Sequence, residues 1–351
     1  MKRITTLLSL LFILSLISCL KPDPIADNAV VDITPVDVLE TVGYARDVVA
    51  HNDLIYVAAS QAGTQIWRDQ AGIVTQVLQH SFSLNPSLRV TLEPQTRLLF
   101  TFDKSQGFYK TLNAEMVDFD SVYIQQPFWL PLFESGLFGS GSNEDFVAKH
   151  INDSLVVLYV IDRTSNDGLK QYYFNRRLND SPEFHYWELN NVGTSTGGIN
   201  LGLDLRDSLL AISHDELGVG LYKLQGVDLD TLVVVNTPGE ALEVKFYENY
   251  LLSANNWAGM EVFDLGSNTN TLTHLSQVEV GGWVKQISLW NDIAILSCGE
   301  NGIFLVDLSD PVNPRVDQAI DAGYTYRTFV ANEMIYAATR EGVKRYRIES
   351  R

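Results

Sequence analysis

A short unit of apolar strands and a glycine returns along most of the chain, and this repetition constrains the fold more than any other feature. The clearest copy, residues 302–314, has a glycine, an apolar strand that ends in an aspartate, and a turn with two prolines. Two more strands, at 284–289 and 293–298, precede that glycine and flank an Asn-Asp turn signal. The unit is therefore strand, tight turn, strand, glycine, strand.

The glycine before the third strand allows the units to be counted. It recurs at Gly63, Gly107, Gly168, Gly220, Gly259, Gly302 and Gly342. The intervals of 39 to 61 residues are typical of units built from four short antiparallel strands, with two long insertions. We therefore predict seven four-stranded units over residues 36–351, or six or eight if the region from 114 to 197 is divided differently.

The ends of the chain indicate how these units are arranged. The first six units are each followed by a candidate outer strand, at 73–80, 116–124, 184–189, 229–235, 272–280 and 316–320. The seventh has none, whereas a strand at 36–43 has no unit of its own. Residues 38–46 and 316–327 both run from a strand through glycine and tyrosine to a basic residue. We predict an all-β, seven-bladed β-propeller in which the N-terminal strand completes the last blade and removes an exposed sheet edge.

The third strand also carries a family resemblance. Residues 304–307 and 261–264, and more loosely 221–223, resemble the strand that names the LVIVD repeat. The resemblance is strong from 198 to 348 and weak from 69 to 197. Proteins of this family are mainly bacterial surface or secreted proteins, so the resemblance implies a propeller outside the cytoplasm. It supplies no catalytic residue.

The N-terminus reads as an export signal. Lys2 and Arg3 precede an uncharged, apolar run over residues 4–18. This run is shorter than the roughly 20 residues of a transmembrane helix. Residues 16–19 resemble the lipobox of bacterial lipoproteins, in which Cys19 would be lipidated and become the first mature residue. An ordinary cleaved signal with an incidental cysteine is the alternative.

By the same resemblance, Leu20 after the cysteine implies an outer-membrane address, facing either the periplasm or the cell surface. Residues 19–35 contain several prolines and acidic residues and are predicted to form the lipidated cysteine and a tether.

The chain is strongly acidic. It has 43 acidic and 25 basic residues, a formal net charge of −18, and loss of Lys2 and Arg3 with the signal makes this −20. Such a charge argues against nucleic acid and anionic lipid surfaces as partners, so we expect membrane contact through the lipid anchor only. Calcium is compatible with many carboxylates, but no calcium motif is present and no cofactor is expected.

Local catalytic signatures are absent from the sequence. None of the six histidines has a metal-ligand spacing, and there is no G-x-S-x-G elbow or P-loop. A Ser-His-Asp set need not be local and stays open. With Cys19 assigned to lipid, Cys298 is left without a disulfide partner and is predicted to be a buried structural thiol.

One set of charged residues stands where the first strands of the units begin. Its members are Arg46, Glu243, Lys285 and Arg327, with Asn200 and Asp145 aligned less surely. The innermost strands of a propeller line its central channel, so these side chains are predicted to converge near one mouth. They would bind an anion or a sugar there, or form a salt-bridged plug.

The insertion at residues 126–142 is rich in aromatic and apolar residues and is too long for a plain connection. It is either an exposed patch for a partner or a lid packed on the propeller. The candidate contact residues are Phe128, Trp129, Leu132, Phe133, Leu137 and Phe138.

These observations favour a lipid-anchored, non-enzymatic module that binds an envelope protein or a glycan. The alternative is a propeller hydrolase or lactonase-like enzyme with a metal on carboxylates around the channel. A third hypothesis is a structural or assembly role in the envelope, which needs a partner but no pocket.

The lipobox interpretation predicts the behaviour of a Cys19→Ser variant. Without the thiol no lipid can be attached, so we expect the exported variant in the soluble fraction while the wild-type protein sediments with membranes. Fractionation with immunoblotting measures this, and a variant that still sediments with membranes would contradict the prediction.

Overall fold

The structure, a computed structural model, describes residues 29–80, 86–104, 110–117, 124–125, 143–163, 168–178, 185–194, 196, 199–268 and 271–351. The predicted signal, Cys19 and the insertion at 126–142 lie outside these ranges. Every regular element in the described ranges is a β-strand. No helix among the described residues has the length and apolar character needed to cross a membrane.

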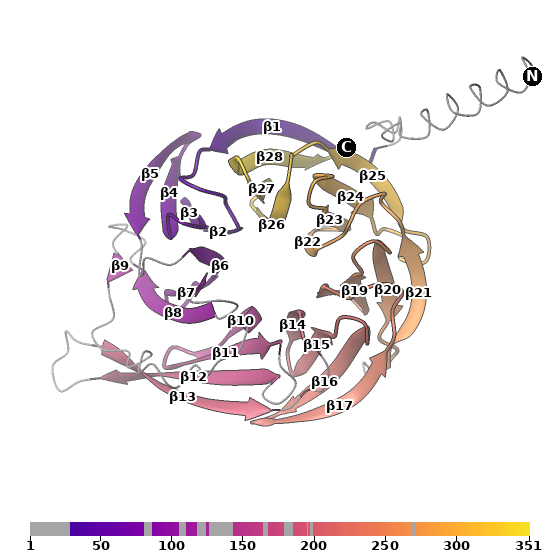
Figure 1. Ribbon diagram of the computed structural model, residues 1–351, viewed down its shortest axis with the longest axis horizontal. Helices are drawn as coiled ribbons and strands as arrows, with labels where there is room; N and C mark the ends of the chain where they lie inside the picture. The colour runs from indigo at the N-terminus through magenta and orange to yellow at the C-terminus, as the bar shows by residue number, and fades with distance from the viewer. Residues whose placement is uncertain are drawn as a thin grey trace, which may run out of the picture.

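The strands form antiparallel sheets that are arranged around a centre (Figure 1). The first is β2 (Asp47–His51), β3 (Leu54–Ala58), β4 (Thr64–Gln70) and β5 (Ile73–His80). The second is β6 (Ser87–Glu93), β7 (Leu98–Lys104), β8 (Lys110–Val117) and β9 (Ile124–Gln125). The third is β10 (Asn143–Asn152), β11 (Leu155–Asp162), β12 (Leu169–Leu178) and β13 (His185–Thr194). The fourth is β14 (Gly202–Arg206), β15 (Leu209–Ser213), β16 (Val219–Gln225) and β17 (Asp228–Val235).

Three further sheets complete the described residues. The fifth is β18 (Glu243–Tyr247), β19 (Tyr250–Ala254), β20 (Met260–Asp264) and β21 (Thr273–Val278). The sixth is β22 (Gln286–Trp290), β23 (Ile293–Ser297), β24 (Ile303–Asp307) and β25 (Arg315–Ile320). The seventh is β26 (Thr325–Ala331), β27 (Met334–Thr339), β28 (Gly342–Ser350) and β1 (Val31–Leu39). The prediction of an all-β propeller with four-stranded antiparallel blades is confirmed.

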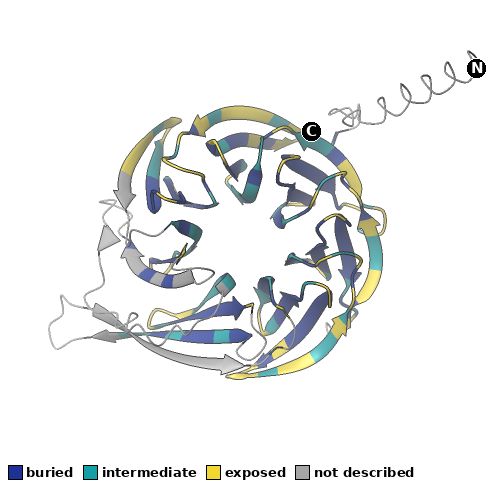
Figure 2. Ribbon diagram, in the orientation of Figure 1, coloured by how far each residue is buried: buried dark blue, intermediate teal, exposed yellow. Residues whose placement is uncertain are grey.

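The hydrophobic core is divided among the interfaces between neighbouring sheets. Seven clusters of buried apolar side chains are present in the described residues, and each joins two adjacent sheets. One of them joins the seventh sheet to the first and contains Tyr336 and Val343 together with Val48 and Ile55. Figure 2 shows the result, with buried inner strands and more exposed outer strands. Each blade therefore depends on two neighbours to cover its two apolar faces.

The N-terminal strand β1 pairs antiparallel with β28, from Val31 opposite Ser350 to Leu39 opposite Val343. The strand was predicted at 36–43, with residues 19–35 as a tether. It begins five residues earlier, because residues 31–35 also find partners on the long strand β28. The sheet therefore includes the end of the predicted tether.

The turns between the first and second strands explain why asparagine recurs there. Asn52, Asn291 and Asn332 have φ angles of 53°, 47° and 49°. Asparagine tolerates this left-handed conformation better than most residues do, because its side chain can hydrogen-bond locally. The predicted Asn-Asp hairpin signals thus correspond to real turn geometry.

The repeated glycine permits a close approach between the third and outer strands. At Gly302 a Cβ atom would lie 2.3 Å from the carbonyl oxygen of Ile320, and at Gly342 2.2 Å from that of Leu39. In the fourth blade the equivalent residue is Gly218, where a Cβ would lie 2.2 Å from the oxygen of Val235. The prediction of Gly220 for this position was therefore wrong by two residues.

The second and third blades differ most from the predicted division. The outer strand expected at 116–124 is β9, which begins only at Ile124, because Met116 and Val117 belong to the third strand and pair with it. The outer strand expected at 184–189 is β13, which continues to Thr194 because it pairs along the whole of β12.

A buried arginine links the last blade to the first. Arg345 on β28 is 1% exposed, its Nε lies 2.6 Å from Asp37 Oδ1 on β1, and it also pairs with Asp69 on β4. Removing one partner from a buried ion pair leaves uncompensated charge. Since both carboxylates keep some solvent contact, we expect Arg345→Ala to lower the free energy of unfolding by about 2 kcal/mol, measured by urea denaturation.

The matched control is Arg351→Ala. Arg351 pairs with Asp32 at 2.6 Å, but the two side chains are 44% and 56% exposed. An exposed pair of this kind contributes at most about 1 kcal/mol. Equal losses in the two variants would show that the buried pair has no special role.

Candidate functional site in the central channel

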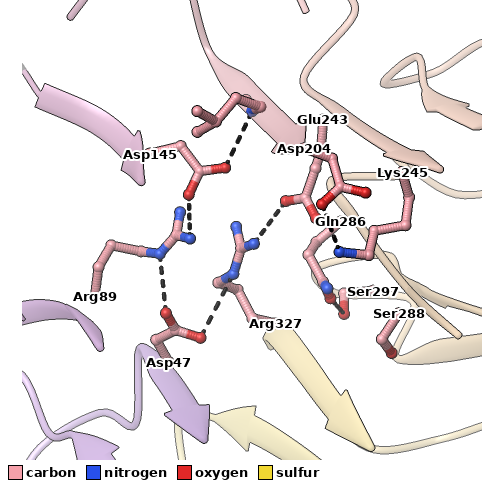
Figure 3. Close-up of polar contacts among 12 residues, drawn as sticks. Asp47, Arg89, Asp145, Asp204, Glu243, Lys245, Gln286, Ser288, Ser297 and Arg327 are labelled. Atoms are coloured by element: carbon pink, nitrogen blue, oxygen red, sulfur yellow. Dashed lines mark hydrogen bonds and ion pairs between the residues drawn. The ribbon is translucent and has the colours of Figure 1, made fainter. Parts of the chain in front are cut away.

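The first strands of the seven sheets surround a central cavity of about 310 Å³. Charged side chains line it from most of these strands: Asp47, Arg89, Asp145, Asp204, Glu243, Lys245 and Arg327. Four are carboxylates and three are cations. They come from parts of the chain that are far apart in sequence, so the ring of blades brings them together (Figure 3).

Asp47 on β2 lies between two arginines. Its Oδ2 is 2.9 Å from Arg89 Nε on β6, and its Oδ1 is 3.5 Å from Arg327 Nε on β26. Arg89 continues to Asp145 on β10, and Arg327 Nη2 lies 2.7 Å from Glu243 Oε2 on β18. These five residues form one chain of ion pairs in which the charges alternate.

A separate pair stands beside this chain. Lys245 Nζ on β18 lies 3.0 Å from Asp204 Oδ1 on β14. The attraction of Asp204 raises the pKa of Lys245 despite its burial, so the amine stays protonated.

Three of the acidic side chains, and the side-chain amide of Gln286, also accept backbone hydrogen bonds across the blade interfaces. In each case the amide belongs to the inner strand of the next blade. The bonds are Val90 N to Asp47 Oδ2 at 3.2 Å, Leu203 N to Asp145 Oδ2 at 3.3 Å, Phe246 N to Asp204 Oδ2 at 2.9 Å, and Thr328 N to the amide oxygen of Gln286 at 2.8 Å. The channel residues therefore hold neighbouring inner strands in register as well as pairing with one another.

Two side chains in this row of ion pairs, Glu243 and Arg89, have shifted pKa values. Burial raises the pKa of the Glu243 carboxyl to about 7, and the opposing attraction of Arg327 only partly offsets it. Burial acts to lower the pKa of Arg89, but the carboxylates of Asp145 and Asp47 outweigh burial and raise it. The guanidinium is therefore charged, whereas Glu243 changes its proton occupancy near neutral pH.

The predicted channel residues divide into two groups. Glu243 and Arg327 line the channel, as does Asp145. Arg46 and Lys285 do not: the Arg46 guanidinium stacks over the Tyr326 ring, and Lys285 Nζ bonds the Tyr324 hydroxyl at 2.8 Å. Arg46 and Lys285 come directly before β2 and β22, and the channel is lined instead by the residues one position later, Asp47 and Gln286.

Asn200, aligned less surely with the channel set, is a buried residue outside it. Its side chain donates to the Asp162 carbonyl at 2.9 Å, and its Oδ1 lies 2.8 Å from His214 Nδ1. His214 in turn contacts the Tyr222 hydroxyl at 2.5 Å. This asparagine supports the blade interior.

Sequence reasoning missed five channel residues. Asp47 and Gln286 directly follow the predicted Arg46 and Lys285, so the correct register would have identified them. Lys245 and Asp204 are the third residues of their five-residue inner strands and face the same side as the first. Arg89 lies in a weakly repetitive blade and gave no local signal.

The arrangement is a salt-bridged plug rather than a set of free ligands. The four carboxylates that meet here, as the metal-enzyme hypothesis required, are each paired with an arginine or lysine. Among the residues that the structure describes, no group of three or more His, Cys, Asp or Glu side chains could hold a metal ion.

The other predicted residues lie elsewhere. Cys298 is buried and unpaired, as predicted, and burial raises the pKa of its thiol to about 12. Cys19 and the six residues of the insertion, Phe128, Trp129, Leu132, Phe133, Leu137 and Phe138, lie outside the described ranges.

Comparison with known proteins identifies the fold. No protein-family model and no curated protein sequence matches this chain. A chain in a crystal structure of the mitotic checkpoint complex is similar with a TM-score of 0.63 and 13% identity, covering 93% of this chain and 94% of that one. The WD40 β-propeller domain of Doa1 gives 0.62 and 11%, with 91% and 97% covered. The computationally designed Ika8 protein gives 0.57 and 9%, with 90% and 99% covered. At such identities the likeness shows a β-propeller and no shared activity.

The raised pKa of Glu243 predicts a pH-dependent stability. A carboxyl whose folded-state pKa lies near 7, above its unfolded value of about 4.5, stabilises the fold fully below pH 4.5 and loses that contribution as the pH rises through 7. Glu243→Gln removes this dependence. We expect the wild-type protein to lose on the order of 3 kcal/mol relative to the variant between pH 4.5 and about 7.5.

Urea denaturation of both proteins at several pH values measures this difference. Glu349→Gln, at an exposed position of β28, is the matched control. A difference between wild type and Glu243→Gln that stays constant with pH would contradict the prediction.

Proposed function

We propose that this closed propeller of seven blades is a non-enzymatic interaction module that binds another protein of the cell envelope. The β-propeller fold supports a binding role, and one of the similar chains was solved as part of a complex, the mitotic checkpoint complex. A glycan is the other ligand class that the sequence left open.

The pairing of the channel charges carries this proposal. All seven charged side chains in the cavity have an opposite charge as partner, and three of the four carboxylates also accept backbone amides. A ligand or substrate in the channel would have to break these bonds and leave buried charges unpaired. Binding therefore belongs to the surfaces and loops of the propeller.

The position in the envelope is part of the same proposal. The lipobox-like residues 16–19 support lipidation of Cys19, and Leu20 after it supports an outer-membrane address. Residues 302–314 support membership of the LVIVD repeat family. The short segment between Cys19 and β1 would hold the propeller close to the membrane.

The hydrolase or lactonase-like alternative is supported by one observation, the meeting of four carboxylates in the channel. It requires that some of them be released from their cations when substrate binds.

Cross-linking in cells expressing the full chain, followed by mass spectrometry, tests the main proposal. An envelope protein recovered at constant stoichiometry, with cross-links that map to propeller surface residues, is the expected result. Recovery of nothing above background would overturn it.

The same experiment tests the insertion. If residues 126–142 form the partner patch, replacing Trp129 and Phe133 by serine removes apolar contact area, and we expect the cross-linked yield to fall at least tenfold without a change in thermal unfolding. Ile73→Ser on β5, at a position that is 72% exposed, is the matched control. An unchanged yield in the double variant would exclude the insertion as the contact.

A further inference from the structure

A cluster of cations and tyrosines lies at the end of the propeller where β2 and β26 begin. We call it the basic aromatic surface, and its members are Tyr44, Arg46, Lys285, Tyr324, Tyr326 and Arg340. They come from the segments that lead into β2, β22 and β26, from the second residue of β26, and from the turn between β27 and β28. Hydrogen bonds from Ala45 N to Thr339 O at 3.0 Å and from Arg340 N to Tyr324 O at 3.3 Å hold these segments together.

The three cations rest on the tyrosine rings. Arg340 Cζ lies 3.9 Å from the centroid of the Tyr324 ring and Arg46 Cζ lies 4.1 Å from that of Tyr326. Lys285 Nζ lies 5.0 Å from the Tyr324 centroid and also donates to its hydroxyl. Such contacts fix the positions of the cations but leave their charges in place.

None of these three cations has a carboxylate partner within the described part of the chain, unlike the cations of the channel. The nearest acidic residue in sequence to Arg340 is Glu341, which pairs with Lys344 at 2.6 Å instead. In a chain with a formal charge of −18, three adjacent cations without acidic partners are a local exception. Lys285 and Arg340 each use part of their hydrogen-bonding capacity on a tyrosine hydroxyl, and the remaining N–H groups of the three cations are available to an anionic group.

Two exposed tryptophans continue this surface over the next blades. Trp283 is two residues before Lys285 and is 59% exposed, and Trp257 is 64% exposed. Their neighbours form a backbone bridge between blades, with Val284 N donating to Asn256 O at 2.8 Å and Asn256 N to Val284 O at 3.1 Å. The surface therefore combines cations with large, exposed apolar rings at one end of the propeller.

We propose that the basic aromatic surface, with Trp257 and Trp283 beside it, binds an acidic polypeptide segment of the partner that also carries apolar side chains. This inference rests on the proposed function and names the surface and the chemistry of the segment. Carboxylates of the segment pair with Arg46, Lys285 and Arg340, and its apolar side chains cover the tryptophans.

The residue types favour a protein over an acidic glycan as occupant. Tryptophan, tyrosine and arginine are the residues that dominate binding energy in protein interfaces. Guanidinium groups that are already oriented by stacking lose little freedom on binding a carboxylate. The rest of the protein is acidic and repels an acidic segment, so the attraction of the basic aromatic surface for that segment acts at short range. Because this attraction is between opposite charges, it weakens with salt.

The test uses the purified full chain in detergent and a fluorescein-labelled ten-residue peptide of alternating glutamate and leucine. Fluorescence anisotropy measures binding at low and high salt. We expect saturable binding that weakens with salt, and a Kd at least tenfold higher for the Arg46→Gln/Arg340→Gln double variant. Lys285→Gln, which keeps both arginines, is a second variant for which we expect a smaller increase.

The matched control is Arg206→Gln. Arg206 also stacks on an aromatic ring, with its Cζ 4.6 Å from the Phe246 centroid, but it lies at the β14–β15 turn, at the other end of the blade. We expect its variant to bind as the wild type does. A peptide of alternating lysine and leucine controls for apolar binding alone.

Three results would overturn the inference: no peptide binding, equal losses in the control variant, or binding of polygalacturonate in place of the peptide. The last would assign the surface to an acidic glycan. The proposed function is tested separately, because cross-linking in cells could still recover a protein whose contacts map to another surface. In that case the function stands and this surface is excluded.

Discussion

The structure depends on the burial of two apolar faces for every sheet. A four-stranded sheet of this kind cannot cover both of its faces alone, and the seven interfacial clusters supply the cover from the neighbours on either side. The first and seventh sheets, at the two ends of the described chain, cover each other in the same way. They do so through the cluster around Val48, Tyr336 and Val343, and β1 completes the seventh sheet by pairing with β28. No terminal blade then has an open apolar face, which a linear stack of repeats would have to cap.

The charged channel is a consequence of the arrangement of the sheets around one centre. Seven inner strands meet at the centre, and the side chains at their first and third positions share a small space. Isolated charges there would be costly, so carboxylates and guanidinium groups alternate from Asp145 through Arg89, Asp47 and Arg327 to Glu243. Buried ion pairs contribute little net stability, but they disfavour other registers because a slipped strand would leave charges unpaired.

Sequence reasoning succeeded where local geometry dictates residue type. The glycines before third strands and the asparagines of the hairpins stand at close approaches and left-handed turns, so their spacing identified blades and inner strands. The channel depends on the exact residue at which each inner strand begins, and there an error of one residue selected Arg46 and Lys285 in place of Asp47 and Gln286. Arg89 could not be found locally, because its partners belong to β2 and β10 and meet it only in the folded ring.

The residues on either side of this one-residue error, Arg46 beside Asp47 and Lys285 beside Gln286, lie in different surroundings. Arg46 and Lys285 come directly before the inner strands β2 and β22, whose first residues, Asp47 and Gln286, line the channel. The inward residues, Asp47 and Gln286, are used in contacts between blades, whereas the basic residues before them are held on tyrosine rings at the end of the propeller. Charges in the channel are thus satisfied internally, while those on the basic aromatic surface stay available to a partner. One position along the chain therefore separates a side chain that bonds between blades from a cation that is held at the end of the propeller.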